Sequence, residues 1–338
     1  MGVGIDVGSK TIKVIDLERA GNVWVLSGSG VVAYQGNSIE SIEDEKELSQ
    51  IAQVIRKLHN DARISKRHVV VSIPEQYVFT RTIRFPMLTD QEIAAAVKWE
   101  AEQYVPIPIN EAVVQHTILE RNEKATPPQV VILLVAAPVI LVEKYLKLFQ
   151  MAGLTIDSIE SEMLALVRSL APENQTSIIV DFGSKTTDIG IAKNKNLFFA
   201  KSLPTAGDAL TRMLTQSLQV EEAQAEEYKK SYGLAKNLLE GKIEQLLSPI
   251  LKGIIEEIRK TIHFYQTEER GEVPKTLILS GGSSGLTDLI PFIARELSME
   301  VIIGNPFGGV KLDSQAAKTI ANYSPLYSIS VGLAQKEV

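Results

Sequence analysis

Two short segments of this chain carry nearly the same residues in the same order, IDVGSKT at 5–11 and VDFGSKT at 180–186. In each copy an apolar strand leads into an acidic residue, a glycine, hydroxyl side chains and a lysine. A hairpin of this kind presents backbone N–H groups, hydroxyls and one carboxylate at its tip. Two such hairpins that face each other could clamp a polyphosphate from both sides.

The residue types in the two turns divide into phosphate donors and metal ligands. Gly8 and Gly183 let the backbone approach phosphate oxygens because they have no side chain. We expect Asp6 and Asp181 to bind Mg²⁺ or its water shell, because a carboxylate beside phosphate requires a bridging cation. The donors expected for the β- and γ-phosphates are Ser9, Lys10, Thr11, Ser184, Lys185 and Thr186. The two lysines could equally be solvated charges at the hairpin tips.

A third glycine-rich segment, LILSGGSSGL at 277–286, follows a predicted strand and precedes a predicted helix. At such a junction Gly281, Gly282 and Ser283 allow a flat ligand to lie against the backbone, and the helix N–H groups attract negative charge. A flexible connection is the alternative. The segment does not fit G-x-G-x-x-G, and no P-loop G-x-x-x-x-G-K-[ST] occurs in the chain, so ordinary Rossmann and Walker sites are disfavoured.

Alternating strands and helices must position these turns. Apolar periodicity and turn residues predict strands at 12–17, 23–32, 68–73, 76–85, 112–119, 130–136, 187–192, 275–280 and 300–303. The same signals predict helices at 48–58, 90–104, 139–151, 158–170, 287–297 and 325–333, and a mostly helical region at 211–264. The helix at 325–333 is expected to be amphipathic or interfacial and to close the fold.

The composition of the chain limits the classes of protein to which it can belong. The chain has 338 residues, of which 45% are hydrophobic, enough for a large core and two lobes. A net charge of −6 disfavours nucleic acid as the main partner. The absence of cysteine excludes disulfides and fits a reducing cytoplasm, and no signal peptide is apparent. The most apolar stretch, 130–142, is shorter than the ~20 residues of a membrane helix and contains Pro138.

The order of these motifs resembles that of the actin, hexokinase and heat-shock chaperone ATPase superfamily. The resemblance implies an α/β, two-lobed actin-like fold, a duplicated ribonuclease-H-like fold, with ATP and Mg²⁺ in the cleft between the lobes. The implied first lobe is 1–85, to which 154–172 and 315–338 return. An FtsA-type small subdomain is inserted at 86–153. The second lobe has a core at 173–208 and 265–314 and a helical subdomain at 209–264.

Within that superfamily, four segments resemble the PilM branch of type IV pilus assembly proteins, which is related to FtsA. They are PMLTDQEI at 86–93, WEAEQYVPIPI at 99–109, IESEMLALVRSL at 159–170 and AEEYKKSYG at 225–233. The last segment implies that Glu226 and Lys229 contact ribose, although this spacing is also typical of a surface ion pair. Glu160 or Glu162, on the linking helix, is the candidate for orienting an attacking water, and the spacing does not decide between them.

The resemblance implies a cytoplasmic ATP-binding scaffold, peripheral to the inner membrane through a protein partner. The expected partner is the N-terminal cytoplasmic peptide of a PilN-like inner-membrane protein, held in a groove beside the inserted subdomain. Other pilus platform proteins, assembly ATPases and self-association are further possibilities. The alternatives are a catalytic ATPase or kinase and a polymerising cytoskeletal protein. Direct membrane insertion is not expected, because the amphipathic C-terminal helix of FtsA proteins has no counterpart before Val338.

Overall fold

Two β-sheets, which share the order of five strands while β14 extends the first, form the frame of the computed structural model, which describes residues 2–320 and 323–337. The first sheet has the order β14-β3-β2-β1-β4-β8 and the second β11-β10-β9-β12-β13. Strands of the first sheet are β1 (Gly2–Val7), β2 (Thr11–Ala20), β3 (Val23–Ala33), β4 (His68–Ile73), β8 (Thr155–Ser161) and β14 (Val310–Lys311). Strands of the second are β9 (Thr176–Phe182), β10 (Thr187–Lys193), β11 (Asn196–Leu203), β12 (Thr276–Ser280) and β13 (Glu300–Ile303).

The two sheets are duplicates in their connections. In each, three consecutive strands pair antiparallel, and the first of them also pairs parallel with the fourth strand. The fourth strand then pairs parallel with the fifth. The internal duplication predicted from the two similar hairpins is therefore present in the fold.

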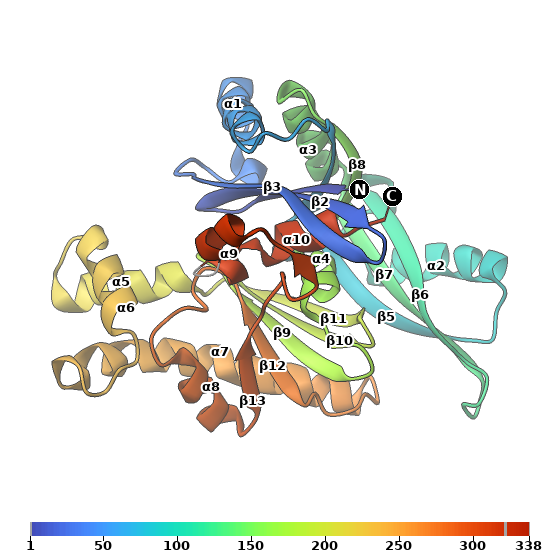
Figure 1. Ribbon diagram of the computed structural model, residues 1–338. Coiled ribbons are helices and arrows are strands. Elements are labelled where there is room, and N and C mark those ends of the chain that lie inside the picture. The colour runs from blue at the N-terminus through green and yellow to red at the C-terminus, as the bar shows by residue number, and fades with distance from the viewer. Residues whose placement is uncertain (1, 321–322, 338) are drawn as a thin grey trace.

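The helices cover these sheets and fill the space between them (Figure 1). They are α1 (Glu45–Asp61), α2 (Asp90–Tyr104), α3 (Val139–Met151), α4 (Glu162–Leu170), α5 (Gly207–Leu218), α6 (Glu222–Tyr232), α7 (Lys242–Thr267), α8 (Leu289–Leu297), α9 (Ser314–Ile320) and α10 (Ser328–Ala334). The start of α2 has a capping box in which Thr89 and Glu92 satisfy each other's backbone N–H groups. The long α7 buries one apolar face against the second sheet, together with α8.

Helices α4 and α10 lie between the two sheets (Figure 1) and approach the backbone closely. A Cβ atom at Gly332 would lie 1.9 Å from the carbonyl oxygen of Ala165, and one at Gly4 would lie 2.1 Å from that of Ser330. Every residue of α10 is buried. The helix expected at 325–333 is found as a 3-10 helix at Ser324–Tyr327 followed by α10, and it lies at the interface between the two sheets. The amphipathic alternative was wrong for α10, because no face of it is exposed.

The linking helix predicted at 158–170 also differs from the structure. Residues 155–161 form β8, which pairs parallel with β4, and α4 begins only at Glu162. Ser161 ends the strand and caps the helix by accepting a hydrogen bond from the N–H of Leu164 at 3.3 Å. The strand is found because the edge of the first sheet offers it a partner, which the local pattern does not reveal.

A third, smaller sheet has the order β5-β7-β6 and consists of β5 (Phe79–Pro86), β6 (Ala112–Asn122) and β7 (Gln129–Pro138). Alternate residues of β7 face two different cores. Ile132 and Leu134 pack with α2, whereas Val131 and Leu133 pack against the second lobe and α4. The small sheet therefore contacts the rest of the molecule through the face of β7 that carries Val131 and Leu133.

Packing corrects both ends of the insert expected at 86–153. At the N-terminal end, β5 begins before the expected insert, at Phe79, and pairs along its whole length with β7. At the C-terminal end, α3 lies within the expected insert but packs with α1 in the core of the first lobe. Phe149 on α3 is fully buried there. The small sheet and α2 therefore span 79–138. Of the expected range 315–338, residues 321, 322 and 338 lie outside the described residues, as does residue 1 of the first lobe.

Candidate functional site

The three glycine turns meet at one cavity of about 280 Å³ between the two lobes. Most residues singled out in the sequence line it: Asp6, Gly8, Ser9, Lys10, Thr11, Glu162, Asp181, Gly183, Ser184, Thr186, Glu226, Lys229, Gly281, Gly282 and Ser283. Two do not. Lys185 borders a separate cavity of about 80 Å³ behind the turns, and Glu160 lies in a groove on another side of β8.

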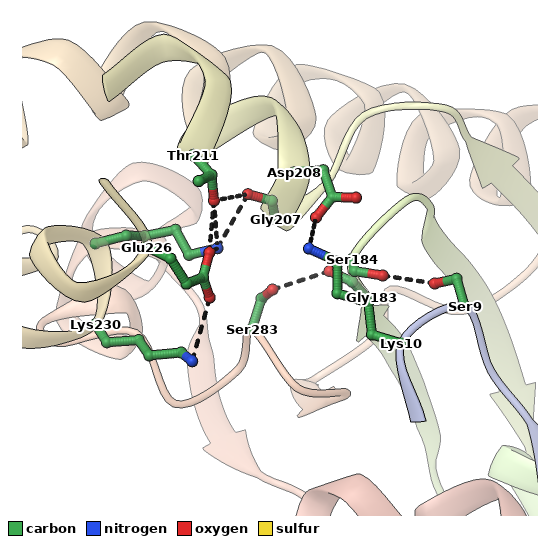
Figure 2. Close-up of polar contacts among 11 residues, drawn as sticks. Ser9, Lys10, Gly183, Ser184, Gly207, Asp208, Thr211, Glu226, Lys230 and Ser283 are labelled. Atoms are coloured by element: carbon green, nitrogen blue, oxygen red, sulfur yellow. Dashed lines mark hydrogen bonds and ion pairs between the residues drawn. The ribbon is translucent and has the colours of Figure 1, made fainter. Parts of the chain in front are cut away.

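The two hairpin turns have the same internal geometry. Gly8 donates its N–H to the carbonyl of Thr11 at 3.1 Å, and Gly183 donates to that of Thr186 at 3.0 Å. The turns also contact each other across the cleft, where the hydroxyls of Ser9 and Ser184 are 2.5 Å apart (Figure 2). Their donors therefore converge on the same space, as a clamp for a phosphate chain requires.

Lys10 crosses the cleft as well. Its ammonium lies 2.5 Å from the carboxylate of Asp208, which stands at the start of α5 in the second lobe (Figure 2). Burial opposes the charged form, but the hydrogen bond and the charge of Asp208 raise the pKa of Lys10. In this structure Lys10 joins the two lobes, although its side chain is still 48% exposed. A bound anion could compete with Asp208 for the ammonium.

The two hairpins differ in the residue that faces the aspartate they have in common. In the first, Lys13 stands opposite Asp6 and donates a buried hydrogen bond of 2.7 Å to its carboxylate. In the second, Asp188 stands opposite Asp181. Lys13 and Asp188 both line the cavity, and the sequence reasoning missed both. Extending the comparison of the two copies by two residues would have revealed them, because each lies seven residues after the aspartate.

The second hairpin consequently places two carboxyl groups together without a cation. Burial raises the pKa of Asp181 to about 6. Burial, together with the charge of Asp181, raises the pKa of Asp188 to about 8. Within the described part of the chain, Asp6 Oδ1 and Asp188 Oδ1 are buried and accept no hydrogen bond. These oxygens are available to a cation or to its water shell.

The structure separates the two glutamates that the sequence left undecided. Glu162, at the start of α4, lines the cavity, and burial together with Asp188, Asp6 and Asp181 raises its pKa well above the usual range. Glu160 is on β8 and accepts two hydrogen bonds from Arg168, at 2.6 and 2.9 Å, and one from Lys336 at 2.9 Å. Its carboxylate is held away from the cavity. Glu160 is therefore not in a position to orient an attacking water there.

The third turn closes the floor of the cavity. Gly281 has φ +85°, and a Cβ atom there would lie 2.6 Å from the carbonyl oxygen of Phe182, so this position requires glycine. Ser283 donates its hydroxyl to the carbonyl of Gly183 at 2.9 Å, which ties the third turn to the second (Figure 2). A Cβ atom at Gly282 would meet only Leu326, at 3.8 Å, and would project into open space.

Helices α5 and α6 supply the remaining wall. Lys229 donates to the hydroxyl of Thr211 at 2.8 Å and to the carbonyl of Gly207 at 3.1 Å, and its ammonium lies 2.6 Å from Glu226. Although burial opposes it, the hydrogen bonds from Lys229 and Thr211 lower the pKa of Glu226 to about 2. The two residues do form an ion pair. Lys229 is buried, however, so the pair is part of the cavity wall rather than a surface feature.

A separate groove of about 300 Å³ lies between the first lobe and the small sheet. Its walls are β8 on one side, β6 and β7 on the other, and α3 at one end. Both β8 and β6 are edge strands of their sheets. The apolar side chains in it are Ile73, Val78, Val113, Val135, Ala137, Val142, Leu146, Ile156 and Ile159. An edge strand beside apolar side chains is suited to an extended peptide.

The described residues contain neither a cluster of metal ligands nor a membrane-spanning helix. No three His, Cys, Asp or Glu side chains in residues 2–320 and 323–337 are grouped so that they alone could hold a metal ion. None of the helices in those ranges is long and apolar enough to cross a bilayer. A metal at the cavity would therefore need ligands from water or from a bound molecule in addition to the carboxylates.

Comparison with known proteins identifies relatives of this chain. The cell division protein FtsA of Streptococcus pneumoniae is 20% identical over 375 aligned residues, which cover 98% of this chain and 79% of FtsA. A solved structure described as a PilM-PilN type IV pilus biogenesis complex has a TM-score of 0.84 at 24% identity, covering 98% of this chain and 97% of that chain. MreB5 of Spiroplasma citri bound to AMPPNP has a TM-score of 0.55 at 11% identity, covering 98% and 93%.

These likenesses confirm the two-lobed, actin-like α/β fold expected from the duplicated hairpins. A sequence model of the family described as type IV pilus assembly protein PilM matches residues 4–338, nearly the whole chain. The match includes all the turns that form the cavity and the small sheet beside the groove. The chain therefore belongs to the PilM family of type IV pilus assembly proteins.

Proposed function

We propose that this chain is an ATP-binding scaffold of type IV pilus assembly, which binds ATP with Mg²⁺ in the cleft between its lobes. The observation that carries the proposal is the meeting of three glycine turns, two from duplicated hairpins, at one cavity. The MreB5 relative of the same fold binds AMPPNP, which supports an adenine nucleotide as the ligand. The backbone N–H groups of the turns, Lys10 and Lys13 supply donors for a triphosphate.

The carboxylates that line the cavity are suited to hold a magnesium ion. Asp6 and Asp188 each have a buried carboxylate oxygen that accepts no hydrogen bond in the described part of the chain, and Asp181 lines the same cavity. Mg²⁺ usually keeps several waters and takes its other ligands from one or two carboxylates and from phosphate. Asp6, Asp181 and Asp188 would hold the ion through such a shell. When bound, it neutralises phosphate charge that these carboxylates would otherwise repel.

The cavity favours a scaffold over a fast ATPase. Glu162 is the carboxyl group placed to orient a water, and burial together with Asp188, Asp6 and Asp181 raises its pKa well above the usual range. A raised pKa favours the neutral carboxyl group, which cannot accept a proton from water as a general base does. We therefore propose that ATP turnover is slow at most, and that nucleotide binding itself is the functional event.

Removal of the Asp181 carboxylate tests the metal assignment. We expect Asp181→Ala to weaken ATP affinity by about 10- to 100-fold in Mg²⁺, because a residue that orients the metal shell is lost. In EDTA the variant should bind ATP at least as tightly as the parent protein, because a carboxylate that repels phosphate has been removed. Isothermal titration calorimetry of both proteins in both buffers measures this. Asp157→Ala, which removes a carboxylate outside the cavity, serves as the control. Equal affinities with and without Mg²⁺ for the parent protein would exclude the assigned ion.

We further propose that the groove beside the small sheet holds the N-terminal cytoplasmic peptide of a PilN-like inner-membrane protein. The neighbour with TM-score 0.84 is described as a PilM-PilN complex, which supports the choice of partner. The groove supports the site, because two edge strands and an apolar floor offer an extended peptide both backbone partners and side-chain pockets. Attachment through this peptide would place the protein at the cytoplasmic face of the inner membrane.

Two exposed residues of α3 provide a matched test of the groove. Leu146 lines it and is 46% exposed, whereas Ile140, 75% exposed, does not line it. We expect Leu146→Glu to weaken peptide binding by at least about tenfold, since burial of a leucine contributes about 1.5–3 kcal/mol. Ile140→Glu should bind as the parent protein does. Fluorescence anisotropy with a labelled PilN N-terminal peptide measures both. Normal binding by folded Leu146→Glu would move the peptide elsewhere.

Deletion of the segment 86–153 is not a usable alternative to these point substitutions. The deletion would remove α3, whose Tyr145, Leu148 and Phe149 are fully buried in the core of the first lobe. It would also leave β5 without β7, its partner strand. The loss of peptide binding in such a variant would then report unfolding rather than the loss of a binding surface.

A further inference from the structure

We propose that the small sheet mechanically couples the nucleotide cleft to the partner groove, because it is fastened to the second lobe while the opposite wall of the groove belongs to the first. This inference rests on the proposed function, since it assigns a regulatory relation between the two proposed sites. It predicts that ATP changes the affinity for the peptide, and that Arg84 is needed for the change.

Polar contacts fasten the small sheet to the second lobe. Arg84, on β5, donates one hydrogen bond to the carboxylate of Glu269 and a second, of 2.6 Å, to its backbone carbonyl just after α7. Thr82, also on β5, donates its hydroxyl to the carbonyl of Phe198 on β11. Glu269 is 13% exposed and Arg84 30% exposed, so the pair is shielded from water more than a surface ion pair. Figure 1 shows β5 alongside β11.

Apolar packing reinforces the same attachment. Val131 on β7 is buried in the core of the second lobe, and Leu119 on β6 packs against that core. Both groove-lining strands, β6 and β7, thus belong to a sheet that is anchored on the second lobe. On β7 the same face does both, since Val131 packs on the second lobe and Val135 and Ala137 line the groove. A rigid sheet attached in this way follows the second lobe when the lobes rotate.

The opposite wall of the groove follows the first lobe. Strand β8 pairs with β4 in the first sheet. Glu160, which lies in the groove, is held by Arg168 on α4, and Arg168 also donates to the carbonyl of Gly332 on α10 at 2.7 Å. This wall is therefore locked to the two helices between the sheets.

The nucleotide site also lies between the first and the second lobe. Ser9 and Lys10 of the first lobe contact Ser184 and Asp208 of the second, each at 2.5 Å, at the tips of the turns. A phosphate chain between the turns must replace these direct contacts with contacts of its own. The spacing between the lobes then differs between the nucleotide-free and the nucleotide-bound states. The nucleotide therefore has a different interaction free energy with each of these two arrangements of the lobes. Movement of the lobes changes the width of the groove, because its two walls belong to different lobes.

Two arginines with the same bonding pattern give a matched experiment. Arg121, on β6, donates to the carbonyl of Leu88 at 2.8 Å and to the carboxylate of Asp90, so its bonds stay within the small sheet and α2. Peptide affinity is measured by anisotropy, with and without saturating ATP and Mg²⁺, for the parent protein, Arg84→Gln and Arg121→Gln. We expect ATP to change the peptide Kd of the parent protein and of Arg121→Gln by about fivefold or more. In Arg84→Gln the change should fall to less than about twofold, while each ligand alone still binds.

The outcomes separate this inference from the proposed function. No ATP binding or no peptide binding by the parent protein overturns the proposed function, and the coupling with it. Binding of both ligands without any effect of one on the other overturns the coupling alone. An undiminished ATP effect in Arg84→Gln overturns the role of the fastening contact.

A second variant and a second measurement cover the case in which Arg84→Gln does not fold. Glu269→Gln removes the charge from the other side of the contact, and the loss of the ATP effect is expected there too. Hydrogen–deuterium exchange of the parent protein needs no partner. We expect ATP to change exchange in β5 and at the end of α7, near Arg84 and Glu269. Unchanged exchange there, with altered exchange at the glycine turns, contradicts the proposal.

Discussion

Replacing Gly282 with valine is expected to abolish ATP binding while the protein remains folded. The backbone of Gly282 is not in the left-handed region, and a Cβ atom there meets only Leu326, at 3.8 Å. The valine side chain therefore fits the protein but occupies the cavity that the nucleotide would enter. We expect ATP affinity to fall by at least about 100-fold, or about 2.7 kcal/mol, measured by isothermal titration calorimetry.

A second glycine of the same turn is the control for this prediction. Gly285 also has open space around a Cβ atom but does not line the cavity. Gly285→Val should therefore bind ATP with nearly the parent affinity. Near-normal ATP binding by folded Gly282→Val would remove this turn from the site. Gly281→Val is not informative, because its side chain would collide with the backbone of Phe182 and disturb the fold.

Replacing Lys13 with methionine is expected to destabilise the fold by about 3–5 kcal/mol. Lys13 donates a 2.7 Å hydrogen bond to Asp6, and their side chains are only 8% and 1% exposed. Loss of the ammonium leaves a buried carboxylate without its counter-charge, which costs far more than a surface pair contributes. The free energy of unfolding from urea titration measures the effect.

Two comparisons isolate the cause of the Lys13 effect. Lys195→Met breaks an exposed ion pair with Glu173 and should cost less than about 1 kcal/mol. Adding Asp6→Asn to Lys13→Met removes the unpaired charge and should recover part of the lost stability. A cost for Lys13→Met as small as that of Lys195→Met would show that the buried pair does not hold the first hairpin.

The similar hairpins were sufficient to predict the duplicated fold, because strand, acidic residue and glycine turn are local features that recur in the chain. Local signals also placed some helices well. The predicted bounds of α2 and α3 agree with the structure, since Thr89 and Glu92 form a capping box and Pro138 precedes α3. The strand of the third turn, expected at 275–280, is found at 276–280.

Non-local pairing explains most of what the sequence reasoning missed. The residue pattern of β5 does not reveal that its partner strand is β7. The inserted subdomain was therefore expected to begin at residue 86, whereas the small sheet begins at residue 79. Glu160 and Glu162 are two residues apart, yet the boundary between β8 and α4 directs one to the groove and the other to the cavity. That boundary depends on the pairing of β8 with β4.

The residue types of the site can be read from the sequence alone, because glycine, hydroxyl and carboxylate groups follow one another in the same order in two turns. Which charged side chains lie opposite one another became known only from the three-dimensional structure. Lys13 lies opposite Asp6 and Asp188 opposite Asp181, so one hairpin is neutralised within itself and the other has two carboxyl groups facing each other. Electrostatic energy depends on distances between atoms, and strands and lobes far apart in the chain set those distances.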